Sequence, residues 1–125
     1  MKELKFRAVI PKRNAIIYFT LKDLIQDKFS NREILWKWLE EGNQPDLFIG
    51  AKDKNNREIY ENDIAKLRKA EGIVEFRKDY GCWDISPLSP SNCYFVMWEE
   101  NWSEVEIIGN IHENPKLVKN EGNKI

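Results

Sequence analysis

A cluster of carboxylates is the first feature of this chain that could carry chemistry. Glu58, Glu61 and Asp63 lie within a span of six residues. Carboxylates at such spacing could hold a hard cation, or serve as a general acid and a general base. Acidic side chains are also typical of solvent-exposed turns. We expect the turn role here, and therefore predict neither catalytic nor metal-binding residues in this cluster.

Thiol and imidazole groups are the second candidates for chemistry. Cys82 and Cys93 are the two cysteines, and His112 is the one histidine. They could form a nucleophile–base dyad or supply three zinc ligands, but the chain lacks Cys-x-x-Cys and His-x-x-His spacing. It also lacks a Gly-x-Ser-x-Gly elbow and a phosphate-binding loop. The sequence predicts no cofactor, and thiols that stay reduced in a cytoplasm.

Basic and aromatic side chains lie near one another in the second half of the chain. Five basic residues lie near two aromatic ones: Lys66, Arg68, Lys69, Arg77 and Lys78, with Tyr80 and Trp83. Small β-barrels bind single-stranded nucleic acid with a face of this kind. However, the chain has 20 basic and 21 acidic residues, and a net charge of −1 provides no overall attraction to a polyanion. Nucleic-acid binding is therefore an alternative hypothesis.

Five tryptophans can contribute large buried or binding areas. Trp83, Trp98 and Trp102 could pack in a core or contact a partner, since tryptophan is enriched among interface anchors. Trp36 and Trp38 cannot share a helix face, so one should pack inward and the other face outward. Open sheets also leave strand edges that pair with other chains. We expect a homo-oligomer, with Trp83, Trp98 and Trp102 as candidate partner contacts.

The first third of the chain predicts a hairpin followed by helical stretches. Apolar residues alternate along both arms of a hairpin at residues 3–19. Thr20 with Asp23, and Ser30 with Glu33, have the spacing of capping boxes. Two short helices, or one bent helix, should therefore follow the hairpin.

The remaining chain predicts short strands separated by turns. Ala70–Gly72 is expected to be a turn, Pro87–Asn92 a loop and Val105–Ile111 the last strand. Strands of about five residues with turn signals every 8–12 residues are typical of a small barrel or sandwich. Residues 119–125 are polar and predict a disordered tail. No apolar run is long enough to span a membrane.

The stretch FIGAKDKNNREIYENDI, at residues 48–64, resembles the signature of the YopX-like phage and prophage proteins. The resemblance continues at residues 5–8 (KFRA), 72–76 (GIVEF) and 106–117 (EIIGNIHENPKL), in the family's order. Residues 21–42, the helical part, resemble the family least.

Two asparagines, Asn56 and Asn62, stand where the family pattern has turn glycines. Asparagine is the residue after glycine that best tolerates positive φ, so both turns can form. Such turns fix strand register, because a one-residue slip would turn every buried side chain outward. The residues that we expect to shape these turns are Gly50, Asp53, Asn56, Tyr60, Asn62 and Asp63.

The resemblance implies a mainly β protein, α+β overall, with a small SH3-like β-barrel after a smaller α+β segment. We place the hairpin and helices in residues 1–46, the barrel in 47–118 and the tail in 119–125. It also implies a phage or prophage origin and the cytoplasm of a bacterial host, but no activity. Our first hypothesis is a non-catalytic oligomeric module that binds host or phage proteins. A nucleic-acid-binding barrel and an enzyme using the carboxylate cluster are the alternatives.

Overall fold

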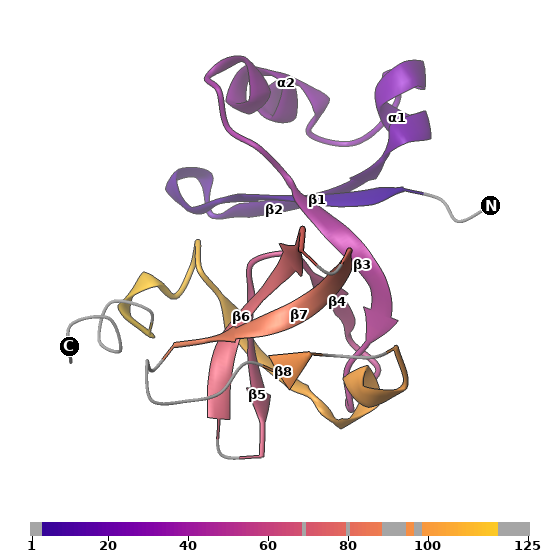
Figure 1. Ribbon diagram of the computed structural model, residues 1–125. Helices are drawn as coiled ribbons and strands as arrows, with labels where there is room; N and C mark the ends of the chain where they lie inside the picture. Colours follow the sequence, from indigo (N-terminus) through magenta and orange to yellow (C-terminus); the bar gives the residue numbers. More distant parts are fainter. Residues whose placement is uncertain (1–3, 69, 80, 89–94, 97–98, 118–125) are drawn as a thin grey trace. The chain divides into compact units, whose positions relative to one another are not determined.

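The computed structural model describes residues 4–68, 70–79, 81–88, 95–96 and 99–117, and it is mainly β (Figure 1). Cys93, Trp98 and the predicted tail lie outside the described residues. The elements up to the boundary of the first unit are β1 (Lys5–Ile10), η1 (Pro11–Arg13), β2 (Ala15–Thr20), α1 (Leu21–Gln26), α2 (Arg32–Glu40) and β3 (Asp46–Lys52). Those that follow are β4 (Glu58–Tyr60), β5 (Asp63–Leu67), β6 (Ala70–Arg77), β7 (Cys82–Pro87), β8 (Phe95–Val96), η2 (Glu99–Glu104) and β9 (Glu106–Asn110).

The chain divides into two compact units, Met1–Phe48 and Ile49–Ile125, and β3 runs through the boundary. One sheet has the strand order β2-β1-β3-β4, and the other has the order β8-β7-β6-β5-β9. Over the described residues the five-strand order is open, with β8 and β9 at its ends. The mainly β class is therefore confirmed, while the closed SH3-like barrel stays a prediction.

The predicted hairpin is confirmed in the first unit. β1 and β2 pair antiparallel without a break, from Lys5 opposite Thr20 to Ile10 opposite Ala15. Asn14 closes the turn with φ 51°, in the left-handed region that asparagine tolerates. In Figure 1 the two helices cover one face of this hairpin. The core between them consists of Ala8, Ile10, Ile17, Phe19 and Leu35.

Two short helices follow, and only the first begins as predicted. The Thr20 hydroxyl accepts a hydrogen bond from the Asp23 backbone N–H at 3.1 Å, and the Asp23 carboxylate accepts one from the Thr20 backbone N–H at 2.9 Å. The capping box expected at Ser30 is wrong. α2 has Asn31 as its N-cap, with φ 63° and no side-chain cap, so the sharp turn at Asn31 starts the helix.

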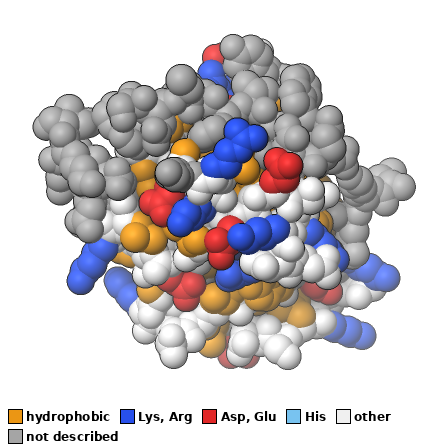
Figure 2. All heavy atoms as spheres, turned by 90° about the horizontal axis from the view of Figure 1, so that it is seen from below, with side chains coloured by type: hydrophobic (Ala, Val, Ile, Leu, Met, Phe, Trp, Pro, Cys, Tyr) orange, Lys and Arg blue, Asp and Glu red, His pale blue; other side chains and the backbone are white. Residues whose placement is uncertain are grey.

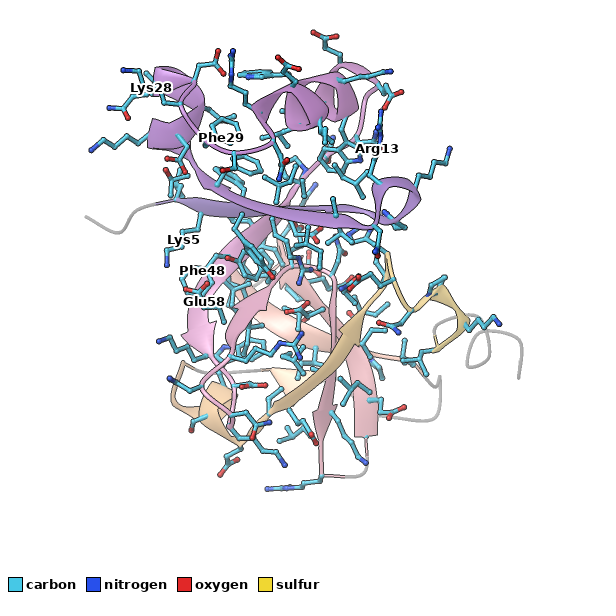
Figure 3. All side chains as sticks on the ribbon, turned by 180° about the vertical axis from the view of Figure 1, so that it is seen from behind. Lys5, Arg13, Lys28, Phe29, Phe48 and Glu58 are labelled. Carbon is cyan, nitrogen blue, oxygen red and sulfur yellow. The ribbon has the colours of Figure 1, made fainter. Side chains whose placement is uncertain are left out.

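The two helix tryptophans point in different directions, as predicted. Trp38 packs against the core of the first unit. Trp36 is 38% exposed, and its indole N–H donates to the Asp27 carboxylate at 2.9 Å. Phe29 lies in the loop between α1 and α2, where its ring stacks on Phe19 with the centroids 6.4 Å apart (Figure 3).

A buried ion pair joins β1 to β3 within the first unit. Arg7 and Asp46 stand opposite each other in the β1–β3 ladder. The Arg7 Nε and Nη2 groups donate to Asp46 Oδ2 at 3.1 and 2.7 Å. Their side chains are only 6% and 2% exposed, so each charge replaces part of the solvation that the other has lost.

The second unit has its own core, to which β5, β6, β7 and β9 of the five-strand sheet contribute. That core contains Ile59, Ala65, Val74, Ile85, Trp102, Val105 and Ile107. The turn predicted at Ala70–Gly72 is wrong, because these residues begin β6. A Cβ at Gly72 would collide with the Ser86 carbonyl and the Ile85 side chain, so this glycine permits close strand packing. The chain turns earlier, at Arg68, which has φ 58°.

No helix in the described part of the chain has the length and apolar character needed to cross a membrane.

Replacing Asp46 tests how much the first unit depends on its ion pair. Asp46→Ala leaves the Arg7 guanidinium buried without its carboxylate. We expect the free energy of unfolding to fall by about 3–5 kcal/mol, measured by urea denaturation. Arg32→Ala is the matched control. Arg32 and Asp27 also lie 2.7 Å apart, but their side chains are 46% and 45% exposed. We expect that loss to stay below about 1 kcal/mol, and equal losses would contradict the argument.

Candidate functional site

The carboxylate of Asp53 closes a tight turn and also binds a distant strand. Its Oδ1 atom accepts hydrogen bonds from the backbone N–H groups of Asn55 and Arg57, both at 2.9 Å. Its Oδ2 atom accepts one from the backbone N–H of Ile107 at 3.0 Å, 54 residues along the chain. Asp53 is 4% exposed. One buried carboxylate therefore fixes this turn against β9.

Backbone groups complete the same turn. The Asn56 N–H donates to the Asp53 carbonyl at 3.0 Å, and Asn56 has φ 63°, so a side chain stands where glycine is favoured. The Lys54 N–H donates to the Val105 carbonyl at 2.8 Å, a second bond toward the start of β9. Gly50, in β3 before the turn, has φ 90°, a conformation that L side chains rarely adopt.

A second turn at residues 60–63 links three strands. The Tyr60 N–H donates to Asp63 Oδ2 at 2.8 Å. Asn62, with φ 70°, donates its N–H to the Val74 carbonyl at 2.9 Å and accepts from the Ile111 N–H at 3.0 Å. The backbone of one asparagine thus connects the turn to β6 and to the residue after β9.

The candidate carboxylate cluster of Glu58, Glu61 and Asp63 lies at the second turn, where Glu58 and Asp63 accept hydrogen bonds. Asp63 is 2% exposed, so the expectation of a solvent-exposed side chain is wrong for this residue. Glu58 accepts a hydrogen bond from the Tyr60 hydroxyl at 3.2 Å. Glu61 is partly buried. Within the described residues, no three His, Cys, Asp or Glu side chains gather as a metal site would require.

The candidate thiol and imidazole groups are partly buried where the structure describes them. Cys82 begins β7 and is free of any disulfide. His112 follows β9, and its backbone N–H donates to Asn110 Oδ1 at 3.0 Å. Cys93 lies outside the described residues.

The basic stretch that could bind nucleic acid is partly neutralised. Arg77 lies 3.8 Å from an Asp79 oxygen and 3.4 Å from an Asp84 oxygen. Lys66, Arg68 and Lys78 are exposed, whereas Lys69 and Tyr80 lie outside the described residues. On the face shown in Figure 2, acidic and basic side chains are intermixed rather than gathered by sign. This arrangement weakens the attraction to a phosphate backbone.

The candidate partner tryptophans have different surroundings. Trp102 is 4% exposed and lies in the core of the second unit. Trp83 is partly buried and packs edge to face with Phe76, with ring centroids 5.3 Å apart. Phe76 is 46% exposed, so this aromatic pair reaches the surface. Trp98 lies outside the described residues.

Asp84 is a fully buried carboxylate in β7. Its Oδ2 atom accepts from Arg77 at 3.4 Å, while Oδ1 has no hydrogen-bond partner. Burial raises the pKa of Asp84 above its ordinary value of 3.8, and the charge of Glu75 on β6 adds to the rise, although Arg77 opposes it. The Glu75 carboxylate accepts a hydrogen bond from the Ser86 hydroxyl. Asp84 therefore holds its proton more tightly than an exposed aspartate does.

Most of the large exposed apolar side chains belong to the first unit, a feature that the sequence reasoning missed. Of the eight in the described residues, six lie there: Leu4, Ile16, Tyr18, Leu21, Ile25 and Trp36. Ile16 and Tyr18 alternate with buried residues on β2. Leu21 and Ile25 lie one turn apart on α1, and Ile25 is 77% exposed. The sequence did contain a signal for this surface, because the segment Ala15–Thr20 (AIIYFT) is apolar on both strand faces.

Comparison with known proteins finds one family. The family described as YopX protein matches residues 5–119, which is nearly the whole chain. No curated protein matches the sequence. The matched region includes both turns and elements of both units.

Asp53→Ala tests the turn that the carboxylate closes. The substitution leaves three backbone N–H groups without their acceptor. We expect the free energy of unfolding to fall by about 3 kcal/mol, measured by urea denaturation. Asp79→Ala is the control, because the Asp79 side chain is 80% exposed. It should change stability by less than about 0.5 kcal/mol. A small loss for Asp53→Ala would show that the turn forms without the carboxylate.

Asp84→Asn tests the buried carboxyl group through pH. Because the folded state holds the proton more tightly than the unfolded state, the contribution of Asp84 to stability is full below pH 3.8. It is lost as pH rises through the raised pKa of the folded state. An amide does not titrate, so the stability of the variant relative to wild type should increase from acidic to neutral pH. Urea denaturation across that range measures the difference, and a constant difference would contradict the assignment.

Proposed function

The chain belongs to the YopX protein family, and we propose that it acts as a non-catalytic, oligomeric protein-binding module. The proposal places it among phage or prophage proteins that work in the cytoplasm of a bacterial host. Other copies of the chain, and a host or phage protein, are the proposed partners. The proposal also takes the second unit as a form of the SH3-like barrel, a fold consistent with its antiparallel strand order.

The exposed apolar residues of the first unit are the observation that carries this proposal. Tyr18 is 60% exposed and Ile25 is 77% exposed, on a strand and a helix that adjoin in sequence. A continuous exposed apolar surface marks protein contacts, whereas single scattered apolar residues need no partner. We infer that the exposed residues of β2 and α1 contribute to such a surface. The described part of the second unit has two large exposed apolar residues, Phe76 and Leu117. The first unit is therefore the better candidate for binding.

The polar residues of the two turns support a role without catalysis. The Asp53 and Asp63 carboxylates accept backbone hydrogen bonds, and Glu58 accepts one from the Tyr60 hydroxyl. A general acid or base must be able to reach a substrate proton. Carboxylates that hold backbone turns are better suited to stabilising the fold than to proton transfer.

Light scattering of the full-length chain tests the proposal. A single chain has a mass of 14.9 kDa. We expect a larger mass that increases with protein concentration and persists in about 0.5 M salt, because apolar contacts are not screened as charges are. A single-chain mass at high micromolar concentration would contradict the oligomer.

Binding to nucleic acid is measured on the same preparation. Single-stranded and double-stranded DNA and RNA are titrated at low ionic strength, and we expect no complex. Binding that weakens steeply with salt would instead favour the nucleic-acid alternative.

A further inference from the structure

β2 is the terminal strand of the first sheet and has an edge without the usual protection. In the described residues its neighbour is β1, and the two strands pair regularly over all six residues. The segment Ala15–Thr20 (AIIYFT) contains no charged residue and no proline. Edge strands commonly carry lysine, proline or a bulge, which prevent pairing with other chains. β2 has none of these devices.

The ladder shows which backbone groups of β2 point toward its outer edge. The Leu21 N–H donates to the Leu4 carbonyl at 3.3 Å, which extends the β1–β2 ladder by one pair. Backbone groups in an antiparallel strand alternate in direction. The backbone N–H and C=O groups of Ile17, like those of Leu21, therefore point toward β1. The backbone groups of Ile16 and Tyr18 point away from β1. The Thr20 N–H, on the same outward side, is bound by the Asp23 carboxylate at 2.9 Å, which agrees with this assignment.

We propose that the β2 strands of two copies pair antiparallel across a two-fold axis centred on Ile17. This inference rests on the proposed oligomeric function and identifies its contact surface. With that centre, Ile16 of each copy lies opposite Tyr18 of the second copy, and both residues direct backbone groups toward the partner strand. Directly opposite residues share a sheet face. The exposed side chains of Ile16 and Tyr18, which are 39% and 60% exposed, therefore meet on one face.

Charge at the strand ends is compatible with this pairing. In Figure 3, Arg13 lies at the turn end of the hairpin, and Lys28 lies near the other end. Antiparallel pairing brings the turn end of each β2 strand, next to Arg13, near the end of the other strand, where α1 begins with Asp23 in its first turn. Lys12 and Lys22 flank the two ends of β2, and both are exposed to solvent. No charged residues oppose each other within the paired strands.

Apolar residues next to the strand enlarge the contact. Leu21 and Ile25 on α1 continue from the end of β2 and are 46% and 77% exposed. A six-residue strand spans only about 20 Å, which is short for a stable interface by itself. We therefore expect a concentration-dependent dimer that the α1 residues strengthen.

Sedimentation velocity over a range of concentrations tests the proposed edge. Ile16→Lys places a charge on the edge, and we expect the dimer dissociation constant to rise at least about tenfold. Ile16→Pro removes one outward N–H without removing a bond to β1, and we expect a similar rise. Leu117→Lys is the matched control, because Leu117 is 37% exposed and Ile16 is 39% exposed. It should associate like wild type.

Hydrogen exchange of the wild-type chain gives a readout that needs no variant. The amides of Ile16 and Tyr18 should gain protection as concentration rises, while exposed amides elsewhere should not. A wild-type chain that stays monomeric would overturn both this surface and the proposed oligomer. The β2 edge alone would be overturned if the Ile16→Lys variant formed the oligomer as well as wild type and the wild-type amides of Ile16 and Tyr18 gained no protection. Equal disruption by Leu117→Lys would also count against the edge.

Discussion

The second unit depends on burying the charge of Asp53 with all of its hydrogen bonds in place. A carboxylate removed from water loses several kcal/mol of solvation unless donors replace the water. Here two donors come from the turn itself, and the third comes from Ile107 in β9. The turn therefore gains its full stability only when β9 is present, and β9 gains a fixed position only when the turn is formed. This requirement couples segments that lie 54 residues apart.

The first unit is held by the same physical rule with a different pair of groups. Arg7 and Asp46 neutralise each other between β1 and β3, and neither side chain is more than 6% exposed. The apolar core of that unit lies on the other face of β1, around Ala8 and Ile10. Apolar burial supplies most of the stabilisation in such a unit. A buried ion pair destabilises any strand register that separates its two charges. Polar residues thus select the pairing that the apolar residues stabilise.

Sequence reasoning succeeded where the deciding interaction is local. The hairpin follows from alternation, and the Thr20 cap depends on a partner three residues away. It failed at Gly72, because this glycine is needed for close packing against the neighbouring strand β7 and not for a turn. Only glycine fits beside Ser86. The bond between Asp53 and Ile107 leaves no periodic signal in the chain. Motifs therefore predict turns and caps, whereas packing between distant strands needs the fold itself.

The same limit applies to the candidate binding surface. Ile16 and Tyr18 on one face of β2 are as apolar as Ile17 and Phe19 on the other, so alternation cannot identify the covered face. The face with Ile17 and Phe19 is the covered one, because the helices pack on these two residues.

The position of this surface explains why family membership reveals the scaffold more readily than the partner. In the stretch that carries the resemblance, Asp53 and Asp63 are buried and hydrogen-bonded, and Asn56 and Asn62 have positive φ. Such residues serve the fold, so any protein with these turns can match the pattern whatever it binds. Most of the exposed apolar side chains lie outside this stretch, and Leu21, Ile25 and Trp36 belong to the helices. The family match therefore rests on residues that build the turns, whereas the proposed contact surface rests on exposed side chains of the first unit.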